Sequence, residues 1–125
     1  MTTHRLSFCN ATLLAPDIAE IIIDGDVEVD ADMLVEYHSW IRNHLPDPCF
    51  LLINKVNPYT YTFKAQMEMA DPLRIKAMAT VVYSEASFET TELLLSLPRE
   101  RPWNLQIFTD RDAALMWLKK QRRKW

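Results

Sequence analysis

A polar and aromatic segment at residues 54–61 carries side chains suited to binding a ligand. Its amide and ammonium groups can hold an anion or a carboxylate, and its tyrosine rings offer a stacking or interface surface. The preceding run at residues 49–53 is short and apolar, as in a strand that a parallel sheet buries on both faces. Open α/β sheets bind ligands outside the carboxyl ends of such strands, so we predict a ligand or partner site here. The predicted site consists of Asn54, Lys55, Asn57, Tyr59 and Tyr61, with Ser84 after the next predicted strand.

A purely structural role would account for the same residues. Asparagine side chains commonly satisfy loop backbone, and tyrosines can cover the edge of a sheet. Ser84 and Ser87 would then cap the helix that begins beside them. Both interpretations fit the sequence.

Histidine, cysteine and glycine often serve catalysis or cofactor binding, but their number and spacing in this sequence do not fit such roles. His38 and His44 lie six residues apart on one predicted helix, about 240° of rotation, so they do not share a face as a metal-binding pair would. Cys9 and Cys49 fall in or beside predicted strands, where a free cysteine usually behaves as a small buried apolar residue. Gly25 is the only glycine, which excludes the glycine-rich loops that bind nucleotide phosphates. We therefore expect a protein that is not an enzyme, with no catalytic residues, metal or cofactor.

Acidic residues are concentrated in the first third of the chain. Residues 6–41 contain eight carboxylates but no lysine or arginine. Asp24, Asp26 and Glu28 follow a predicted strand and would suit a docking surface or a cation site. Carboxylates at such positions also favour solubility and stabilise a helix N-terminus, and the spacing of a calcium-binding loop is missing.

Basic residues gather in a short C-terminal segment at residues 119–125. Such a cluster beside tryptophans could contact anionic lipid or nucleic acid, yet cations in a last helical turn are stabilising without any partner. The formal net charge of −3 argues against a polyanionic partner, so we expect no nucleic-acid binding and at most peripheral contact with a membrane. A meeting of the acidic and basic regions between subunits would favour a homodimer. The basic residues are Lys119, Lys120, Arg122, Arg123 and Lys124.

The spacing of apolar residues predicts the elements that position these groups. Two strands followed by alternating helices and strands indicate an α/β fold with right-handed crossovers, a mixed and mostly parallel sheet of five strands, and about four helices. The first strand is expected as an antiparallel edge. With 125 residues, 49% of them hydrophobic, we expect one domain spanning residues 1–125. Strands are predicted at residues 6–14, 18–23, 49–53, 75–83 and 104–108, and helices at 31–45, at 63–70, from 84 to Pro98, and after a capping box at Thr109.

A strand that runs into residues 22–27, Ile-Ile-Asp-Gly-Asp-Val, and is followed by a helix resembles the STAS domains of anti-sigma-factor antagonists and sulfate transporters. The chain is more similar to small bacterial proteins called STAS-like, SpoIIAA-like or Sec14-like. The residues that carry this similarity lie at 51–55, 59–63, 81–84, 103–104, 107–108 and 110–118. The resemblance covers nearly the whole chain and implies a SpoIIAA-like fold. Antagonist STAS domains are phosphorylated at a serine or threonine beside an aspartate in this region, but here Thr60 and Thr62 stand without such a pair, so no phosphosite is carried over.

These observations together favour a non-enzymatic STAS-like interaction or regulatory module. It would bind a protein partner, or assemble with itself, through residues 54–61 and the adjacent helix ends. The Sec14-like resemblance implies an alternative, a binder of a small apolar or amphipathic ligand held between helices and sheet near a membrane surface. The first ten residues lack a signal-peptide core, and no apolar run approaches the roughly twenty residues of a spanning helix, so we expect a cytoplasmic protein.

Overall fold

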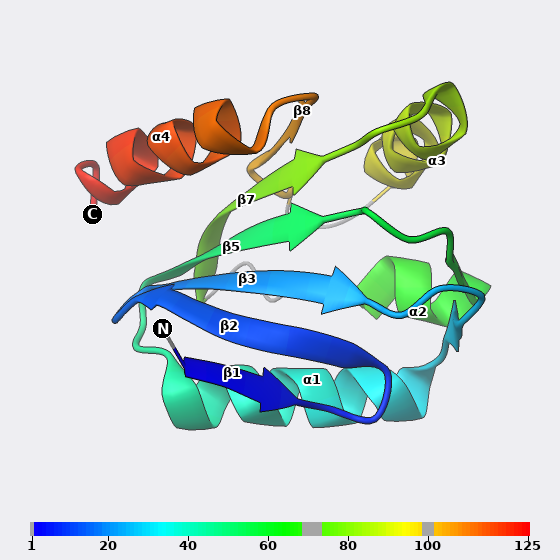
Figure 1. Cartoon of the computed structure of the whole chain (residues 1–125), viewed down its shortest axis with the longest axis horizontal. Coiled ribbons are helices and arrows are strands. Elements are labelled where there is room, and N and C mark those ends of the chain that lie inside the picture. The colour runs from blue at the N-terminus through cyan, green and yellow to red at the C-terminus, as the bar shows by residue number, and fades with distance from the viewer. Residues whose placement is uncertain (1, 69–73, 99–101) are drawn as a thin grey trace.

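A mixed six-stranded sheet forms the centre of the molecule (Figure 1). The computed structural model describes residues 2–68, 74–98 and 102–125. Within the sheet the order is β1-β2-β3-β5-β7-β8, with antiparallel pairing from β1 to β3 and parallel pairing from β3 to β8. The prediction of an α/β fold with a mostly parallel sheet and four helices is therefore confirmed. The six strands are β1 (Thr2–Arg5), β2 (Cys9–Ala15), β3 (Ile18–Ile23), β5 (Cys49–Asn54), β7 (Ile75–Val81) and β8 (Leu105–Phe108).

The predicted count of five strands is wrong because β1 lacks an apolar signature. Its sequence Thr-Thr-His-Arg is mostly exposed, and only His4 is partly covered. The strand is held by pairing with β2 and by the indole of Trp40, whose Nε1 donates a hydrogen bond to His4 Nδ1 at 2.7 Å. Consequently β1 forms the antiparallel edge of the sheet. The predicted first strand corresponds to β2, which is the second strand from that edge.

Two further differences arise from short or irregular segments. The predicted strand at residues 6–14 begins only at Cys9, because Leu6 and Phe8 are buried in the tight connection between β1 and β2. A small parallel sheet of β4 (Glu28–Val29) and β6 (Thr60–Tyr61) was not predicted, since two residues carry no periodicity.

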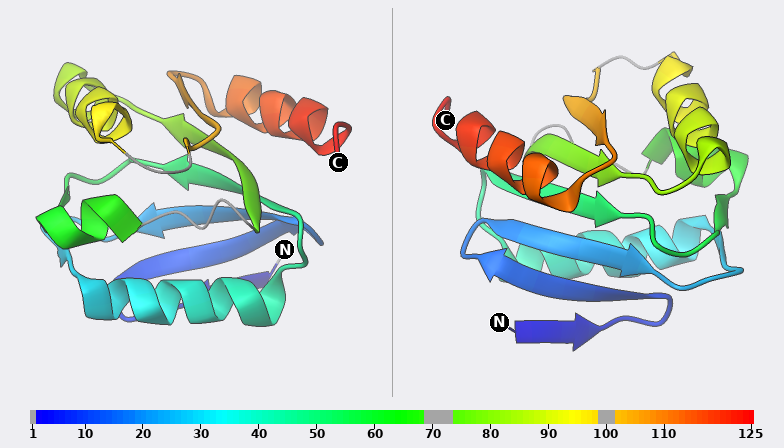
Figure 2. Two further views of the ribbon diagram at one scale, coloured as in Figure 1. Left: turned by 180° about the vertical axis from the view of Figure 1, so that it is seen from behind. Right: turned by 45° about the horizontal axis from the view of Figure 1, so that its top comes forward.

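Helices cover both faces of the sheet, and each face has its own apolar core (Figure 2). The first core joins α1 (Ala31–His44), α2 (Phe63–Glu68) and α3 (Glu85–Ser96) to residues such as Ile21 and Ile53. The second core joins α4 (Arg111–Arg122) to residues such as Phe50 and Leu52. All six residues of β5 are buried, as predicted for a strand covered on both faces, and each fully buried leucine contributes about 1.5–3 kcal/mol.

The helix starts follow from side-chain caps. The Asp30 side chain accepts a hydrogen bond from the Met33 backbone amide at the start of α1, and the Ser84 hydroxyl accepts one from the Ser87 amide at the start of α3. The predicted capping box at Thr109 is wrong, because the carboxylate of Asp110 caps α4 and accepts from the amides of Asp112 and Ala113. The predicted end of α2 near residue 70 lies outside the described residues.

Candidate ligand-binding pocket

The last residue of β5 and the residue after it point to opposite sides of the sheet. Asn54 lies on the α4 side, where its amide donates to Glu20 at 3.0 Å and its oxygen accepts from the Tyr83 hydroxyl at 2.7 Å. Lys55 lies on the side of α3, where its Nζ donates to the Thr91 hydroxyl at 2.9 Å. This divergence follows from the alternation of side chains along a strand. The predicted site is therefore divided between two separate environments.

Lys55 opens onto a cavity of about 380 Å³ at the carboxyl edge of the sheet. This volume lies in the usual range of roughly 300–1,000 Å³ for small-molecule sites. Three chain segments enclose it: the turn after β3, the loop after β5, and the first turns of α3, which gather at the right of the sheet in Figure 1. The lining residues are Asp26, Val27, Glu28, Lys55, Asn57, Pro58, Tyr59, Thr60, Ser84, Ala86, Ser87 and Thr90.

Burial sets the electrostatics of Lys55. Its side chain is only 7% exposed, and desolvation lowers the pKa of its ammonium group to about 8. The Nζ lies 5.5 Å from the ring centre of Tyr59 and 5.7 Å from that of Tyr61, close enough for cation–π attraction. In the described part of the chain, no carboxylate forms an ion pair with it. The pocket thus contains a buried ammonium group that forms no ion pair with a carboxylate of the described residues.

Two tyrosine rings lie close to this charge, and Tyr59 is the one that lines the cavity. The rings of Tyr59 and Tyr61 meet edge to face with centres 5.5 Å apart, and their hydroxyl oxygens lie 3.4 Å from each other. Burial raises the pKa of Tyr61 to about 12 and that of Tyr59 well above its ordinary value. Both phenols therefore stay protonated at neutral pH and can donate hydrogen bonds but carry no negative charge.

A third tyrosine lies deeper on the same side. Among the described residues, the buried hydroxyl of Tyr37 has no hydrogen-bond partner. Its ring borders an apolar space of about 10 Å³ between α1 and the sheet, which Tyr61 also lines. That volume corresponds to about one water molecule.

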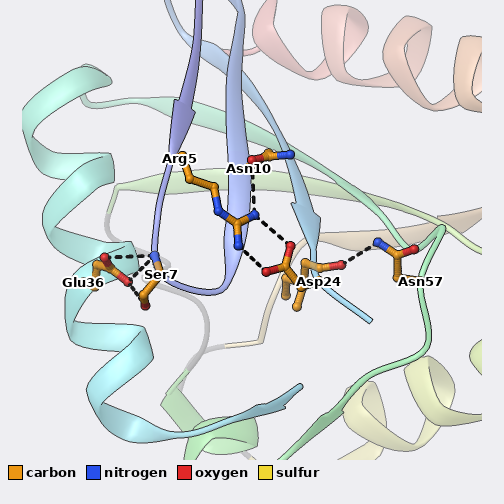
Figure 3. A network of polar contacts seen from close by, with 7 residues as sticks. Arg5, Ser7, Asn10, Asp24, Glu36 and Asn57 are labelled. Atoms are coloured by element: carbon orange, nitrogen blue, oxygen red, sulfur yellow. Dashed lines mark hydrogen bonds and ion pairs between the residues drawn. The ribbon is translucent and has the colours of Figure 1, made fainter. Parts of the chain in front are cut away.

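Backbone contacts fix the loop that carries Lys55. The side-chain amide of Asn57 donates through Nδ2 to the backbone carbonyl of Ile23 at 3.0 Å, and Figure 3 shows this side chain turned toward the end of β3. The Asp26 amide donates to the Pro58 carbonyl at 2.7 Å. Asp26 has φ 61, a left-handed conformation that aspartate tolerates better than most residues. The loops after β3 and β5 are therefore tied together, and their side chains face one cavity.

The predicted site residues occupy three kinds of position. Lys55, Asn57, Tyr59 and Ser84 line the pocket, and Ser84 is at once the cap of α3. Tyr61 is buried below the pocket, at 8% exposure. Asn54 does not reach the pocket, for the reason given above.

Sequence reasoning treated the acidic residues after β3 as a separate cluster. Asp26 and Glu28 share the pocket with Lys55, whereas Asp24 turns away and pairs with Arg5 (Figure 3). Asp26 and Glu28 reach the pocket because β3 and β5 are parallel neighbours whose carboxyl ends meet at one edge. The contributions of Thr90 and Thr91 were missed, since hydroxyl residues in a helix carry no specific signal.

On the α4 side, the charges compensate one another. Arg111 binds the Glu20 carboxylate through two hydrogen bonds, of 2.7 and 2.9 Å. Burial acts to raise the pKa of Glu20, but the hydrogen bonds from Arg111 and Asn54 outweigh it and the pKa is lowered. With the Tyr83 hydroxyl on Asn54, this network ties β3 and β5 to the start of α4.

The basic C-terminal segment lies at the opposite edge of the sheet from the pocket (Figure 1). Arg122 forms an ion pair with Asp17 at 2.7 Å, and Lys76 lies over the ring of Trp125 at 5.0 Å. Part of the segment is thus engaged within the chain. Its other cations, Lys119, Lys120, Arg123 and Lys124, are exposed.

The cysteines and histidines contact residues outside the pocket. Cys9 and Cys49 are buried thiols, as predicted, and burial raises the pKa of Cys9 to about 12. His44 stacks on Trp40, with ring centres 4.9 Å apart. The described residues contain no group of three or more histidine, cysteine or carboxylate side chains placed to hold a metal ion.

Comparisons with known proteins return no relative. Searches against models of protein families, curated proteins and solved structures each found no match. Of the helices in the described ranges, none combines the length and apolar character that a membrane-spanning segment requires.

Proposed function

We propose that this protein is a non-enzymatic binding module, STAS-like in architecture, that recognises a carboxylate group in the pocket around Lys55. The single observation that carries the proposal is a buried ammonium group at a cavity of about 380 Å³ with no carboxylate paired to it among the described residues. The module would act by holding a partner or ligand rather than by transforming it.

Electrostatics favour an anionic group at this position. A buried charge without a counter-charge is costly, and an incoming carboxylate would offset that cost through a charge-assisted hydrogen bond. Ser87 lines the same cavity and its hydroxyl can donate a further hydrogen bond, whereas the Thr90 hydroxyl already donates to the carbonyl of Ala86 at 2.9 Å. The start of α3, capped by Ser84, adds the favourable field of a helix N-terminus.

The polar pocket fits this role better than the space between α1 and the sheet. That inner space is about 10 Å³, room for about one water molecule, and its lining is apolar apart from two tyrosines. We therefore assign recognition to the pocket at the carboxyl edge and not to a chamber for an apolar ligand.

The proposal is tested by titrating ¹⁵N-labelled protein with sodium caproate at pH 7, against sodium chloride at matched ionic strength. We expect the amide signals of residues 55–60 to titrate in the wild type. In Lys55→Met the apparent affinity should fall at least about tenfold, the value of one charge-assisted contact. Lys64→Met, which removes an exposed lysine on α2, is the matched control and should titrate as the wild type does.

Folding of Lys55→Met is checked by the dispersion of its amide spectrum. Affinity in the wild type should also weaken above about pH 8, where Lys55 loses its proton. Equal titration of wild type and Lys55→Met, or no titration by any carboxylate, would overturn the proposal.

A further inference from the structure

Charges of both signs line the pocket. Of its described lining residues, three carry a charge at neutral pH: Lys55, Asp26 and Glu28. Lys55 is buried, while the two carboxylates are exposed. The positive charge therefore lies deep and the negative charges lie at the mouth.

The two carboxylates at the mouth differ from other acidic residues near the sheet. Three of those other residues form ion pairs with arginines: Asp17 with Arg122, Glu20 with Arg111 and Asp24 with Arg5. Asp26 and Glu28 form no ion pair with the described residues, Lys55 included. The pocket thus separates one unpaired cation from two unpaired anions.

The separation of the charges determines which charged groups a ligand should carry. The formal charge of the lining is 1 − 2 = −1, so a simple anion would be attracted by Lys55 but repelled by Asp26 and Glu28. A ligand with a carboxylate at one end and an ammonium group at the other would meet an opposite charge at each end. Electrostatic complementarity of this kind selects among ligands more strongly than it adds affinity.

We infer that the pocket binds a small amino carboxylate, with its carboxylate on Lys55 and its ammonium group beside Asp26 and Glu28. This inference rests on the proposed function and names the ligand class for the same pocket. A free amino acid or a short amino acid derivative belongs to that class.

Three probes of similar length separate the two ends of the ligand. ε-Aminocaproate carries both charges, caproate lacks the ammonium group, and hexylamine lacks the carboxylate. Each is titrated into ¹⁵N-labelled protein at pH 7, with γ-aminobutyrate as a shorter amino carboxylate. We expect the better amino carboxylate to bind at least about tenfold more tightly than caproate, because one additional charge pair is worth about that factor.

Charge-neutral variants of the mouth supply the control. In the double variant Asp26→Asn, Glu28→Gln the advantage of ε-aminocaproate over caproate should vanish, while caproate should bind more tightly than in the wild type. Glu92→Gln, which removes an exposed carboxylate from α3 outside the pocket, should leave both affinities unchanged.

The outcomes separate this inference from the proposed function. Equal affinity for caproate and both amino carboxylates, with Lys55 still required, would overturn the inference and leave the carboxylate site intact. Binding by hexylamine alone, or no binding by any probe, would overturn both. An advantage for amino carboxylates that persists in the double variant would place the ammonium group elsewhere and overturn the inference.

Discussion

Two neighbouring residues, Asn54 and Lys55, lead into regions with opposite electrostatic character. On the α4 side, the Glu20 carboxylate accepts hydrogen bonds from Arg111 and Asn54, so every charge in that network has a partner. On the α3 side, Lys55 has a hydroxyl and two aromatic rings but no carboxylate among the described residues. The paired network on the α4 side stabilises the fold. The ammonium group on the α3 side lacks an ion pair that an anionic ligand could supply.

This contrast makes opposite predictions for substitutions on the two sides. Removing one member of a satisfied network leaves buried groups without partners and destabilises the fold. Removing a buried charge that forms no ion pair should stabilise the fold and weaken the binding of any ligand that the charge holds.

Among these substitutions, we expect the one at Glu20 to change the free energy of unfolding most. Glu20→Gln removes the negative charge that Arg111 and Asn54 share, so we expect the free energy of unfolding to fall by about 2–3 kcal/mol in urea denaturation. Asp17→Asn, which breaks the more exposed pair with Arg122, is the matched control and should cost about 1 kcal/mol or less. Equal losses in the two variants would refute the distinction between a closed network and a surface pair.

The substitution Lys55→Met should act in the opposite direction. We expect it to raise the free energy of unfolding at pH 7 by about 1–2 kcal/mol, because it removes the cost of a buried charge, less the lost hydrogen bond and ring contacts. Urea denaturation measures the change, and a loss of stability at pH 7 would contradict the account.

The gain from Lys55→Met should also depend on pH. In the wild type the folded pKa of about 8 lies below the ordinary lysine value of 10.5, so the unfolded chain binds more protons between these values. Wild-type stability from this group therefore rises with pH through that window. The advantage of Lys55→Met should be full below about pH 8 and should shrink toward pH 10.5.

A smaller effect is expected at Tyr37, whose buried hydroxyl has no partner among the described residues. Tyr37→Phe should raise the free energy of unfolding by about 1 kcal/mol. Tyr83→Phe is the matched control, because it deletes a hydroxyl that donates to Asn54 and should lower stability by about 0.5 kcal/mol. Destabilisation by Tyr37→Phe would show that its hydroxyl is satisfied in solution.

The strands and helices with strong periodicity could be predicted from the sequence, and the weakly patterned ones could not. The apolar run at β5 and the cap at Asp30 carry local signals that the fold confirms. β1 is polar and depends on a contact between His4 and Trp40, 36 residues apart, which no local pattern reveals. At α4, Thr109 and Asp110 both suit a cap, and the cap geometry selects Asp110.

The sequence indicates where in the fold the candidate site lies, but it does not show which side chains share the pocket. The loop after the buried strand lies at the carboxyl edge, and four of the predicted residues line the cavity there: Lys55, Asn57, Tyr59 and Ser84. The separation of Asn54 from Lys55 depends on which face each side chain takes at the end of β5. The proximity of Asp26 and Glu28 depends on the pairing of β3 with β5, which is a tertiary property.

Titration of the Lys55 ammonium group shows whether it is buried without an ion pair and whether it binds a carboxylate. The Cε signal of Lys55 in ¹³C-lysine-labelled protein, assigned by its loss in Lys55→Met, reports the pKa. We expect a pKa of about 8 in the free protein and a higher value when ε-aminocaproate is added, because a bound carboxylate favours the charged form. A pKa near 10.5 that does not respond to the ligand would contradict this expectation.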